Sequence, residues 1–191
     1  MRRALKFLFL TAVMALFWAP TQAYADGYVS PFAGLNFSTS TQVNKRGDYG
    51  VNAGWMGAGV AGLEVDFGFS PSYFGDDAVI GSNNVFDLMG NFIVGVPVGG
   101  QKGAGVRPYG TVGFGLLKQH IDAMGTRPEI NNNDPGINVG AGVMGYFGDH
   151  VGLRGDVRYF RDVHSSTTTN SLLINFGGFH YVRASIGIVF R

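Results

Sequence analysis

Apolar residues recur at every second position along much of this chain, and this alternation constrains the fold more than any other feature. In residues 62–70 every odd position carries Leu, Val or Phe, and every even position is polar or glycine. Successive side chains of a β-strand point to opposite faces, so this pattern predicts a strand with one apolar and one polar face. After residue 25 the chain has no apolar run of the roughly 20 residues that a membrane helix requires. The chain is therefore predicted to be all-β.

Eight segments with this alternation follow residue 25, and the connections between them alternate in length. The predicted strands are 28–38, 49–57, 60–73, 84–97, 107–119, 136–147, 150–162 and 175–190. Long polar connections lie near 39–48, 74–83, 120–135 and 163–174, and tighter ones near 57–60 and 148–149, with a longer turn at 98–106. Long loops at one end and short turns at the other are typical of outer-membrane barrels. We therefore predict an eight-stranded antiparallel up-and-down transmembrane β-barrel.

The polar face of these segments favours a membrane barrel over a soluble one. A soluble sandwich or lipocalin-like barrel also alternates, but its polar face would be solvated. Here that face is rich in Gly, Ser and Asn rather than Lys and Glu, as a crowded interior requires. Because lipid offers no hydrogen bonds, a lipid-facing sheet must close on itself. Aromatic residues near the strand ends are expected to form interfacial girdles. These are Phe37, Tyr73, Phe74, Phe86, Tyr109, Tyr146, Phe147, Tyr159 and Tyr181.

The first 25 residues have the features of a cleavable signal peptide. A basic start with Arg2, Arg3 and Lys6 is followed by an apolar run at 7–18. Ala23 and Ala25 form a small-x-small cleavage site, so we expect cleavage after Ala25 and a barrel domain of residues 26–191. The alternative, a membrane-spanning helix, needs a longer run than the dozen or so apolar residues present.

Composition excludes several function classes. Removing the signal peptide takes three of the 14 basic residues and none of the 13 acidic ones, which leaves a net charge near −2. That balance does not favour nucleic acid as a partner. The chain has no Cys, which excludes thiolate catalysis and Cys-ligated metals, and its four His are scattered without metal-ligand spacing. We expect neither a metal nor another cofactor.

Four stretches carry a family resemblance that covers nearly all of the chain after the signal peptide. They are residues 62–71, 107–110, 154–160 and 183–190, and they resemble the small outer-membrane barrels related to OmpA and OmpX. The resemblance implies an eight-stranded barrel whose last strand ends in an aromatic residue read by the assembly machinery. Phe190 occupies that position, although Arg191 follows it where such chains usually stop at the aromatic residue. An integral outer-membrane location also implies contact with outer-membrane lipid, including lipopolysaccharide.

Charged residues fall on the polar faces of the predicted strands. The expected inward set is Glu64, Asp66, Asp87, Arg154, Asp156, Arg158 and Arg183, and Ile93 is expected to be an inward exception among the apolar residues of its strand. An eight-stranded barrel is only wide enough for side chains to fill it. Opposite charges should therefore pair and plug the lumen. The alternative is a narrow ion or proton pathway gated by those pairs.

A possible catalytic pair lies where the seventh predicted strand enters its outer loop. His164 and Ser166 resemble the His-x-Ser arrangement of barrel enzymes that deacylate lipid A, and Asp162 could orient the base. A serine hydrolase also needs an oxyanion hole, and no residues for one can be identified. The Ser/Thr/Asn composition of this segment is that of an ordinary loop.

The sequence therefore favours a non-enzymatic barrel with a packed lumen. Its expected role is structural or surface interaction through the outer loops, since loops on a rigid scaffold usually carry recognition residues. The alternatives are a small porin-like channel and a lipid A-modifying enzyme. The surface ligand is not identified by the sequence.

Overall fold

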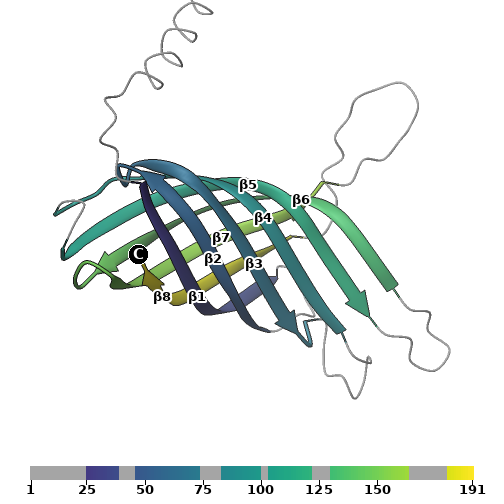
Figure 1. The fold of residues 1–191 in the computed structure, drawn as a ribbon. Coiled ribbons are helices and arrows are strands. Elements are labelled where there is room, and N and C mark those ends of the chain that lie inside the picture. Colours follow the sequence, from purple (N-terminus) through teal and green to yellow (C-terminus); the bar gives the residue numbers. More distant parts are fainter. Residues whose placement is uncertain (1–24, 39–45, 74–82, 100–102, 122–129, 164–179) are drawn as a thin grey trace, which may run out of the picture.

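Eight antiparallel strands close into a barrel in the computed structural model (Figure 1). The structure describes residues 25–38, 46–73, 83–99, 103–121, 130–163 and 180–191. The strands are β1 (Ala25–Ser38), β2 (Arg46–Gly57), β3 (Ala61–Pro71), β4 (Asn83–Gly95), β5 (Gly105–Ile121), β6 (Ile130–Tyr146), β7 (Val151–Asp162) and β8 (His180–Phe190). Each strand pairs with its sequence neighbours, and β1 also pairs with β8. The predicted fold class is confirmed.

The alternation in the sequence becomes an inside and an outside of the barrel wall. Along β3, every second side chain is buried in the lumen and the intervening ones are exposed on the outer surface. Leu63, for example, is 59% exposed, whereas its neighbour Glu64 is 2% exposed. Strands β1 and β8 pair with each other, so the sheet has no open edge. Val29 pairs with Phe190 at one end of this seam, and Phe37 pairs with Val182 near the other. Closure satisfies the backbone groups that lipid could not.

None of the described residues forms a helix long and apolar enough to cross a membrane.

One predicted strand bound is wrong, the start of the sixth strand in the β5–β6 hairpin. The sixth strand was expected to begin at residue 136, but β6 begins at Ile130 and pairs with β5 out to Ile121. Asn, Asp and Pro at 131–135 predict a loop, yet cross-strand hydrogen bonds continue through this segment. Local pairing in a hairpin therefore outweighs the weak strand propensity of these residues. The other described bounds differ from the predictions by three residues or fewer, and residues 175–179 of the expected last strand lie outside the described part.

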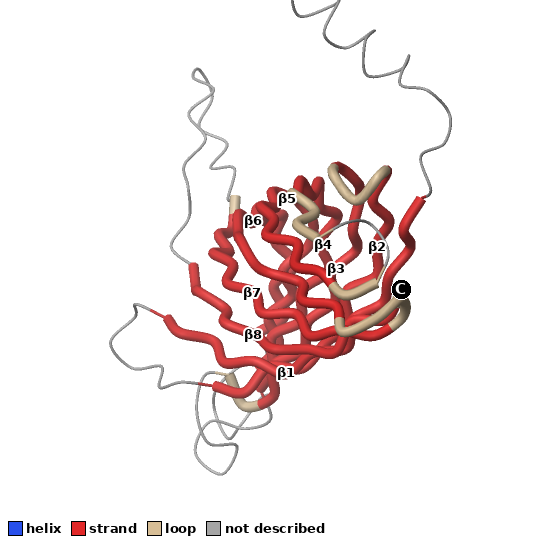
Figure 2. The backbone as a smooth tube through the Cα atoms, turned by 90° about the vertical axis from the view of Figure 1, so that its left-hand side faces the viewer, coloured by secondary structure: helices blue, strands red, loops and turns tan. Residues whose placement is uncertain are grey.

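The barrel has two different ends. The turn end carries the connections 58–60, 96–104 and 147–150, whose described residues are drawn in tan in Figure 2. The loop end carries the connections between β1 and β2, β3 and β4, β5 and β6, and β7 and β8. In the turn before β3, Gly59 has a positive φ of 68°, a conformation that glycine adopts without steric cost. The first strand begins at the turn end, and the last strand ends there.

The lumen contains two apolar clusters separated along the barrel axis. The cluster at the turn end comprises Tyr28, Met56, Ile93, Tyr109, Met144, Tyr146 and Val189. The cluster at the loop end comprises Tyr73, Val85, Met89, Leu117, Phe160 and Tyr181. In the latter, Phe160 and Tyr181 stack with ring centroids 4.7 Å apart and an interplanar angle of 5°. The inward position predicted for Ile93 agrees with this arrangement.

Four tyrosines expected in the interfacial girdles lie inside the barrel instead. Tyr73, Tyr109, Tyr146 and Tyr181 are all nearly completely buried. Tyr109, Tyr146 and Tyr181 alternate with outward residues on their strands, so the pleat directs them inward, whereas Tyr73 lies two residues beyond the end of β3. The phenolic groups of Tyr109 and Tyr181 hydrogen-bond to lumen carboxylates, which explains why tyrosine suits these positions. Phe37 and Phe147 do point outward, as a girdle requires.

Candidate functional site

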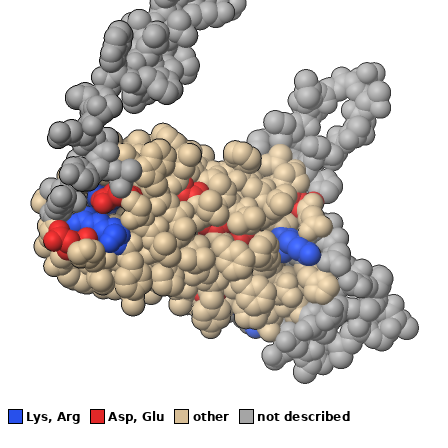
Figure 3. All heavy atoms as spheres, viewed as in Figure 1, with Lys and Arg blue, Asp and Glu red and all other residues tan. Residues whose placement is uncertain are grey.

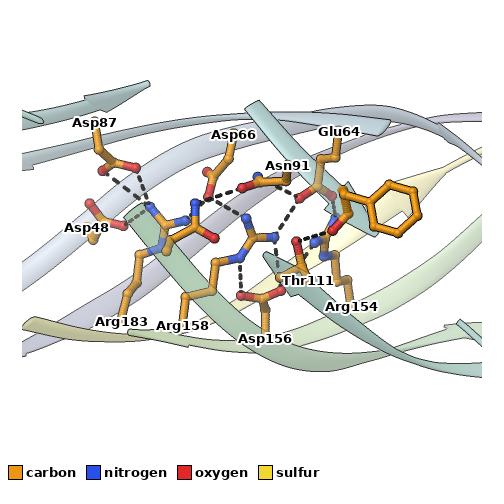
Figure 4. A network of polar contacts seen from close by, with 12 residues as sticks. Asp48, Glu64, Asp66, Asp87, Asn91, Thr111, Arg154, Asp156, Arg158 and Arg183 are labelled. Carbon is orange, nitrogen blue, oxygen red and sulfur yellow. Dashed lines mark hydrogen bonds and ion pairs between the residues drawn. The ribbon is translucent and has the colours of Figure 1, made fainter. Parts of the chain in front are cut away.

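Arg158 on β7 is the centre of an ion-pair network in the middle of the lumen (Figure 4). Its Nη1 donates to Oδ2 of Asp66, its Nη2 to Oε1 of Glu64 and its Nε to Oδ1 of Asp156, each at 2.7 Å. All five nitrogen-bound protons of a guanidinium lie in one plane, and this fork can engage several carboxylates at once. The side chain of Arg158 is 0% exposed. One cation thereby joins carboxylates from β3 and β7 across the barrel.

Arg154, four residues before Arg158 on β7, forms a second set of contacts closer to the turn end. Its Nη1 lies 2.6 Å from Oε2 of Glu64, and its Nη2 lies 3.2 Å from Oδ2 of Asp156. Its Nε donates to the hydroxyl oxygen of Tyr109 at 2.7 Å, and that hydroxyl in turn donates to Asp156. The hydroxyl of Tyr28 donates to Oε2 of Glu64 at 2.6 Å. Glu64 and Asp156 are therefore shared between two arginines.

Arg183 on β8 forms the third part of the network, towards the loop end. Its Nη1 lies 3.1 Å from Oδ1 of Asp87 and 3.4 Å from Oδ2 of Asp48, and its Nη2 pairs with Asp66. The guanidinium carbon lies 4.6 Å from the ring centroid of Phe160, a cation–π contact. Asp66 therefore links Arg183 to the contacts around Arg158.

Carboxylates outnumber guanidinium groups in this part of the lumen. Five acids, Asp48, Glu64, Asp66, Asp87 and Asp156, face three arginines, Arg154, Arg158 and Arg183. Neutral donors supply the remaining hydrogen bonds: Asn91 Nδ2 donates to Glu64 at 3.3 Å and Ser70 Oγ donates to Asp48 at 2.7 Å. Each arginine is shared by two or more acids, so losing one would leave several carboxylates with one counter-charge fewer.

A smaller group of charges closes the turn end. Nη2 of Arg107 lies 3.1 Å from Oδ2 of Asp26, and Nη1 of Arg191 lies 3.7 Å from the same oxygen. Arg191 also donates through Nε to the backbone oxygen of Asp149 at 2.8 Å and through Nη2 to that of Gly103 at 3.1 Å. Its guanidinium carbon lies 4.1 Å from the ring centroid of Tyr146. The residue that departs from the family pattern thus joins the end of the last strand to two turns.

The structure places all seven predicted lumen residues inside the barrel and brings them into one network. Sequence reasoning missed Asp48 and Arg107, which complete the ion pairs at either end, and it missed the lumen roles of Tyr28 and Tyr109. The alternation of inward and outward positions could have identified the two charged residues. Asp48 precedes the outward Tyr49, and Arg107 lies between the outward Val106 and Pro108.

The remaining predicted residues fall at the margins of the described structure. His164 and Ser166 lie outside the described residues, as does Ala23, and Ala25 is the first residue of β1. Asp162, considered as an orienting acid, is buried on the lumen side of β7. Phe190 ends β8 and points outward, and its role as an assembly signal stays a prediction. Within the described ranges, no group of three or more His, Asp or Glu side chains could hold a metal ion.

Comparison with known proteins identifies the family. The family model described as "Outer membrane protein beta-barrel domain" matches residues 9–180. The chain belongs to this family. It is an integral protein of the bacterial outer membrane, and its turn end accordingly faces the periplasm and its loop end the cell exterior. The family description names a barrel domain and no catalytic activity.

Solved structures of outer-membrane barrels share the architecture. Neisserial surface protein A superimposes with a TM-score of 0.65 at 18% identity, covering 87% of this chain and 97% of that one. The N-terminal barrel domain of Pseudomonas aeruginosa OprF gives 0.53 at 18% identity, with 86% and 98% coverage. Ail, the attachment invasion locus protein of Yersinia pestis, gives 0.54 at 12% identity, with 87% and 96% coverage. At these identities the likeness concerns the fold. No curated protein sequence matches the chain.

Proposed function

We propose that this outer-membrane barrel acts at the cell surface through its four outer loops, and that its lumen is a sealed structural core without catalytic activity. The observation that carries the proposal is the filling of the lumen. Arg107, Arg154, Arg158 and Arg183 are among its largest fully buried side chains. An eight-stranded barrel has little interior space beyond that needed for side chains.

The arrangement of the lumen supports a seal more than a pathway. A conducting path would need a continuous line of water from end to end, but apolar clusters lie on both sides of the charge network. Arg154, Arg158 and Arg183 each already donate to two or more oxygens, so an ion would have to displace those bonds to pass. Breaking such buried pairs one partner at a time is costly.

A filled lumen leaves the outer loops as the parts of the chain that can meet other molecules at the cell surface. Loops held by a rigid scaffold commonly carry recognition residues. The fourth outer connection is rich in Ser, Thr and Asn, which supply hydrogen-bonding groups rather than an apolar core. The names of two barrels of similar fold, a surface protein and an attachment locus protein, agree with a role at the cell surface.

The test is single-channel conductance of the protein refolded into a planar bilayer. The wild type is expected to show no openings, whereas a variant with both Arg154→Ala and Arg158→Ala is expected to conduct, because two buried guanidinium groups are removed from the middle of the lumen. Arg161→Ala is the matched control, since Arg161 lies on the same strand but on its outer side. Reproducible openings of the wild type would move the function to transport.

A second measurement tests the absence of catalysis. Lipid A from cells expressing the wild type, His164→Ala or Ser166→Ala should show the same acylation as lipid A from cells without the protein. Loss of an acyl chain that depends on either residue would establish a deacylase and overturn the non-enzymatic proposal.

A further inference from the structure

The half of the lumen network nearer the turn end is balanced in charge. This turn-side half consists of two guanidinium groups, those of Arg154 and Arg158, and two carboxylates, those of Glu64 and Asp156. Each of the four carboxylate oxygens accepts a hydrogen bond from at least one of the two guanidinium groups. The turn-side half therefore needs no further cation.

The half nearer the loop end has more carboxylates than cations. In this loop-side half, Arg183 faces the three carboxylates of Asp48, Asp66 and Asp87, and Asp48 and Asp87 lie at the same end of the network (Figure 4). Asp66 also binds Arg158, but the charge of Arg158 is already matched in the turn-side half. If all three acids were ionised, the loop-side half would carry two negative charges in excess. Unbalanced charge is costly in a confined interior with little water.

Asp48 has the poorest hydrogen bonding of these three acids. Its Oδ1 accepts from the hydroxyl of Ser70 at 2.7 Å. Its Oδ2 lies 3.4 Å from Nη1 of Arg183, yet it is buried and accepts no hydrogen bond from the residues that the structure describes. In Asp87, by contrast, both oxygens accept from Nη1 of Arg183, at 3.1 and 3.3 Å, and Oδ2 also accepts from Tyr181 at 3.4 Å. A buried carboxylate oxygen without a donor carries the full cost of its desolvation.

The strands next to Asp87 supply no second cation from their described residues. On β5 the inward neighbour of Asp87 is the apolar Leu117, and on the far side of Leu117 lies another acid, Asp134 of β6. Asp66 on β3 adds a further negative charge near Asp87, and Arg158 on β7 adds a positive charge that Asp66 itself binds. The neighbouring strands therefore do not relieve the excess of negative charge.

Asp48 lies close to the loop end of the barrel. The next inward residue of β2 is Arg46, whose side chain is partly exposed and forms no ion pair within the part of the chain that the structure describes. On β1, the inward residues beside Asp48 are the uncharged Gly34 and Asn36. On the visible face of the outer wall, Lys and Arg atoms lie near the two ends of the barrel (Figure 3). Because water screens a partly exposed guanidinium, Arg46 offsets the buried excess only weakly.

We propose that the pair formed by Asp48 and Asp87 around Arg183 binds one proton in the folded barrel. Two carboxyl groups that share one cation ionise together only against their mutual repulsion, so the pair takes up and loses the proton as a unit. The proton removes one of the two excess charges, and it supplies the hydrogen bond that Oδ2 of Asp48 lacks. Asp66 stays ionised because two guanidinium groups bind it. This proton site goes beyond the sealed lumen proposed above and does not depend on it.

Proton binding gives the stability of the barrel a defined dependence on pH. In the unfolded chain an aspartate loses its proton around a pKa of about 3.9. The folded barrel keeps the shared proton at higher pH, so a rise in pH above that value favours the unfolded chain until the folded barrel has lost the proton as well. Each proton held by the folded but not by the unfolded chain lowers the folding constant about tenfold per pH unit. Because Asp48 lies near the loop end, an acidic exterior tightens this half of the lumen.

Equilibrium urea unfolding of the refolded protein in detergent micelles measures this dependence. The folding constant of the wild type is expected to fall about tenfold from about pH 5 to about pH 6. Asp48→Asn and Asp87→Asn each give the loop-side half the charge that it has with the proton bound. Both variants should lose this fall, and at about pH 8 both should be at least as stable as the wild type. Titration of the histidines is common to all variants, so the comparison isolates the pair.

Asp156→Asn is the matched control, because it removes a carboxylate from the balanced turn-side half. It leaves Arg154 and Arg158 with one counter-charge fewer, so the folding constant should drop at least about tenfold at every pH while the fall over the acidic interval remains. A wild-type folding constant that does not change over that interval would overturn the proposal. So would a fall that survives in either Asp48→Asn or Asp87→Asn, or a loss of stability in these two variants at about pH 8 as large as that in Asp156→Asn.

Infrared spectroscopy detects the proton independently of stability. A protonated carboxyl group has a C=O stretching band apart from the bands of carboxylates, and at about pH 6 ordinary Asp and Glu side chains are ionised. The folded wild type is expected to show one such band at this pH, lost in Asp48→Asn and in Asp87→Asn and kept in Asp156→Asn. Absence of the band from the wild type, or its persistence in the two variants, would overturn the proposal. The wild-type spectrum decides the point even where a variant does not fold.

Discussion

The two faces of the barrel wall are made by the same strands but obey opposite rules for charge. On the lumen face of β7, Arg154, Asp156 and Arg158 are all buried, and each has at least two oppositely charged partners or hydroxyl contacts. On the outer face of the same strand, Leu153 and Val157 are bare apolar side chains, and the one charge, Arg161, comes at the loop end. Inside, charge is tolerated anywhere if it is paired. Outside, it is tolerated only where the strand leaves the hydrocarbon.

The difference reflects what each environment offers. The lumen supplies partners but little water, so a buried charge is stable only while its whole set of contacts is intact. Lipid supplies neither partners nor water, so depth decides the cost of a charge on the outer face. The first rule concerns pairing and the second concerns position, and substitutions can separate them.

The largest effect is expected from Arg158→Ala. This change removes the cation shared by Glu64, Asp66 and Asp156, and it should lower the free energy of unfolding by about 3–5 kcal/mol. Equilibrium urea unfolding in detergent micelles measures the change. Arg161→Ala, on the outer face of the same strand, should cost less than about 1 kcal/mol. Equal losses in the two variants would contradict the idea that pairing in the lumen sets the cost.

The rule of depth is tested by placing a lysine at two heights on the outer face of β5. Val112→Lys, near the middle of the strand, is expected to lower the free energy of unfolding by about 2–4 kcal/mol. Leu116→Lys, close to the native Lys118, is expected to cost about 0–1 kcal/mol. The same unfolding measurement compares them. Similar costs at both positions would show that depth does not govern this face.

Glycines on the two faces offer a smaller contrast. A Cβ on the lumen-facing Gly142 would collide with the hydroxyl of Tyr109 and the backbone oxygen of Gly155, so Gly142→Ala should cost about 1–3 kcal/mol. The outward Gly90 has open space, and Gly90→Ala should change stability by less than about 0.5 kcal/mol. A destabilising Gly90→Ala and a neutral Gly142→Ala would reverse the expected order of packing on the two faces.

The smallest effect is expected where the lumen meets the periplasm. Arg191→Ala removes contacts to backbone oxygens of two turns and to Asp26, and it should cost about 1 kcal/mol because water can replace part of them. Asp149→Ala is a useful control, because Arg191 contacts the backbone rather than the side chain of that residue. A loss as large as that of Arg158→Ala would mean that the turn end behaves like the buried lumen.

Much of the fold follows from the sequence because a period of two fixes the face of every residue in a strand. That logic predicted the strand number and the inward side of charged residues such as Glu64 and Arg158. It did not identify Asp48, which lies just before the predicted strand 49–57, or Arg107, which is the first residue of the predicted strand 107–119. It also assigned inward tyrosines such as Tyr109 to the interfacial girdle, because they lie near strand ends. The inward or outward position of each residue on its strand decides the side, and for Tyr109 that position is inward.

The sequence predicted that lumen charges pair, but not which arginine meets which acid. Glu64 and Arg154 are 90 residues apart in the chain, and Asp66 and Arg183 are 117 apart. Which arginine meets which acid depends on the stagger between strands when the sheet closes, and no local pattern encodes it. The β5–β6 hairpin shows the same limitation at shorter range, since pairing of Ile121 with Ile130 was hidden by the loop-like composition between them.

The seam between β1 and β8 has a consequence for the order in which the molecule is completed. Arg183 arrives on the last strand, and until that strand docks, Asp48 and Asp87 lack the guanidinium that neutralises them. Contacts between the two ends of a chain close the longest loop and so carry the largest loop-closure entropy. The final strand therefore completes two features together: its pairing with β1 closes the hydrogen-bonded edge of the sheet, and Arg183 brings the counter-charge for Asp48 and Asp87.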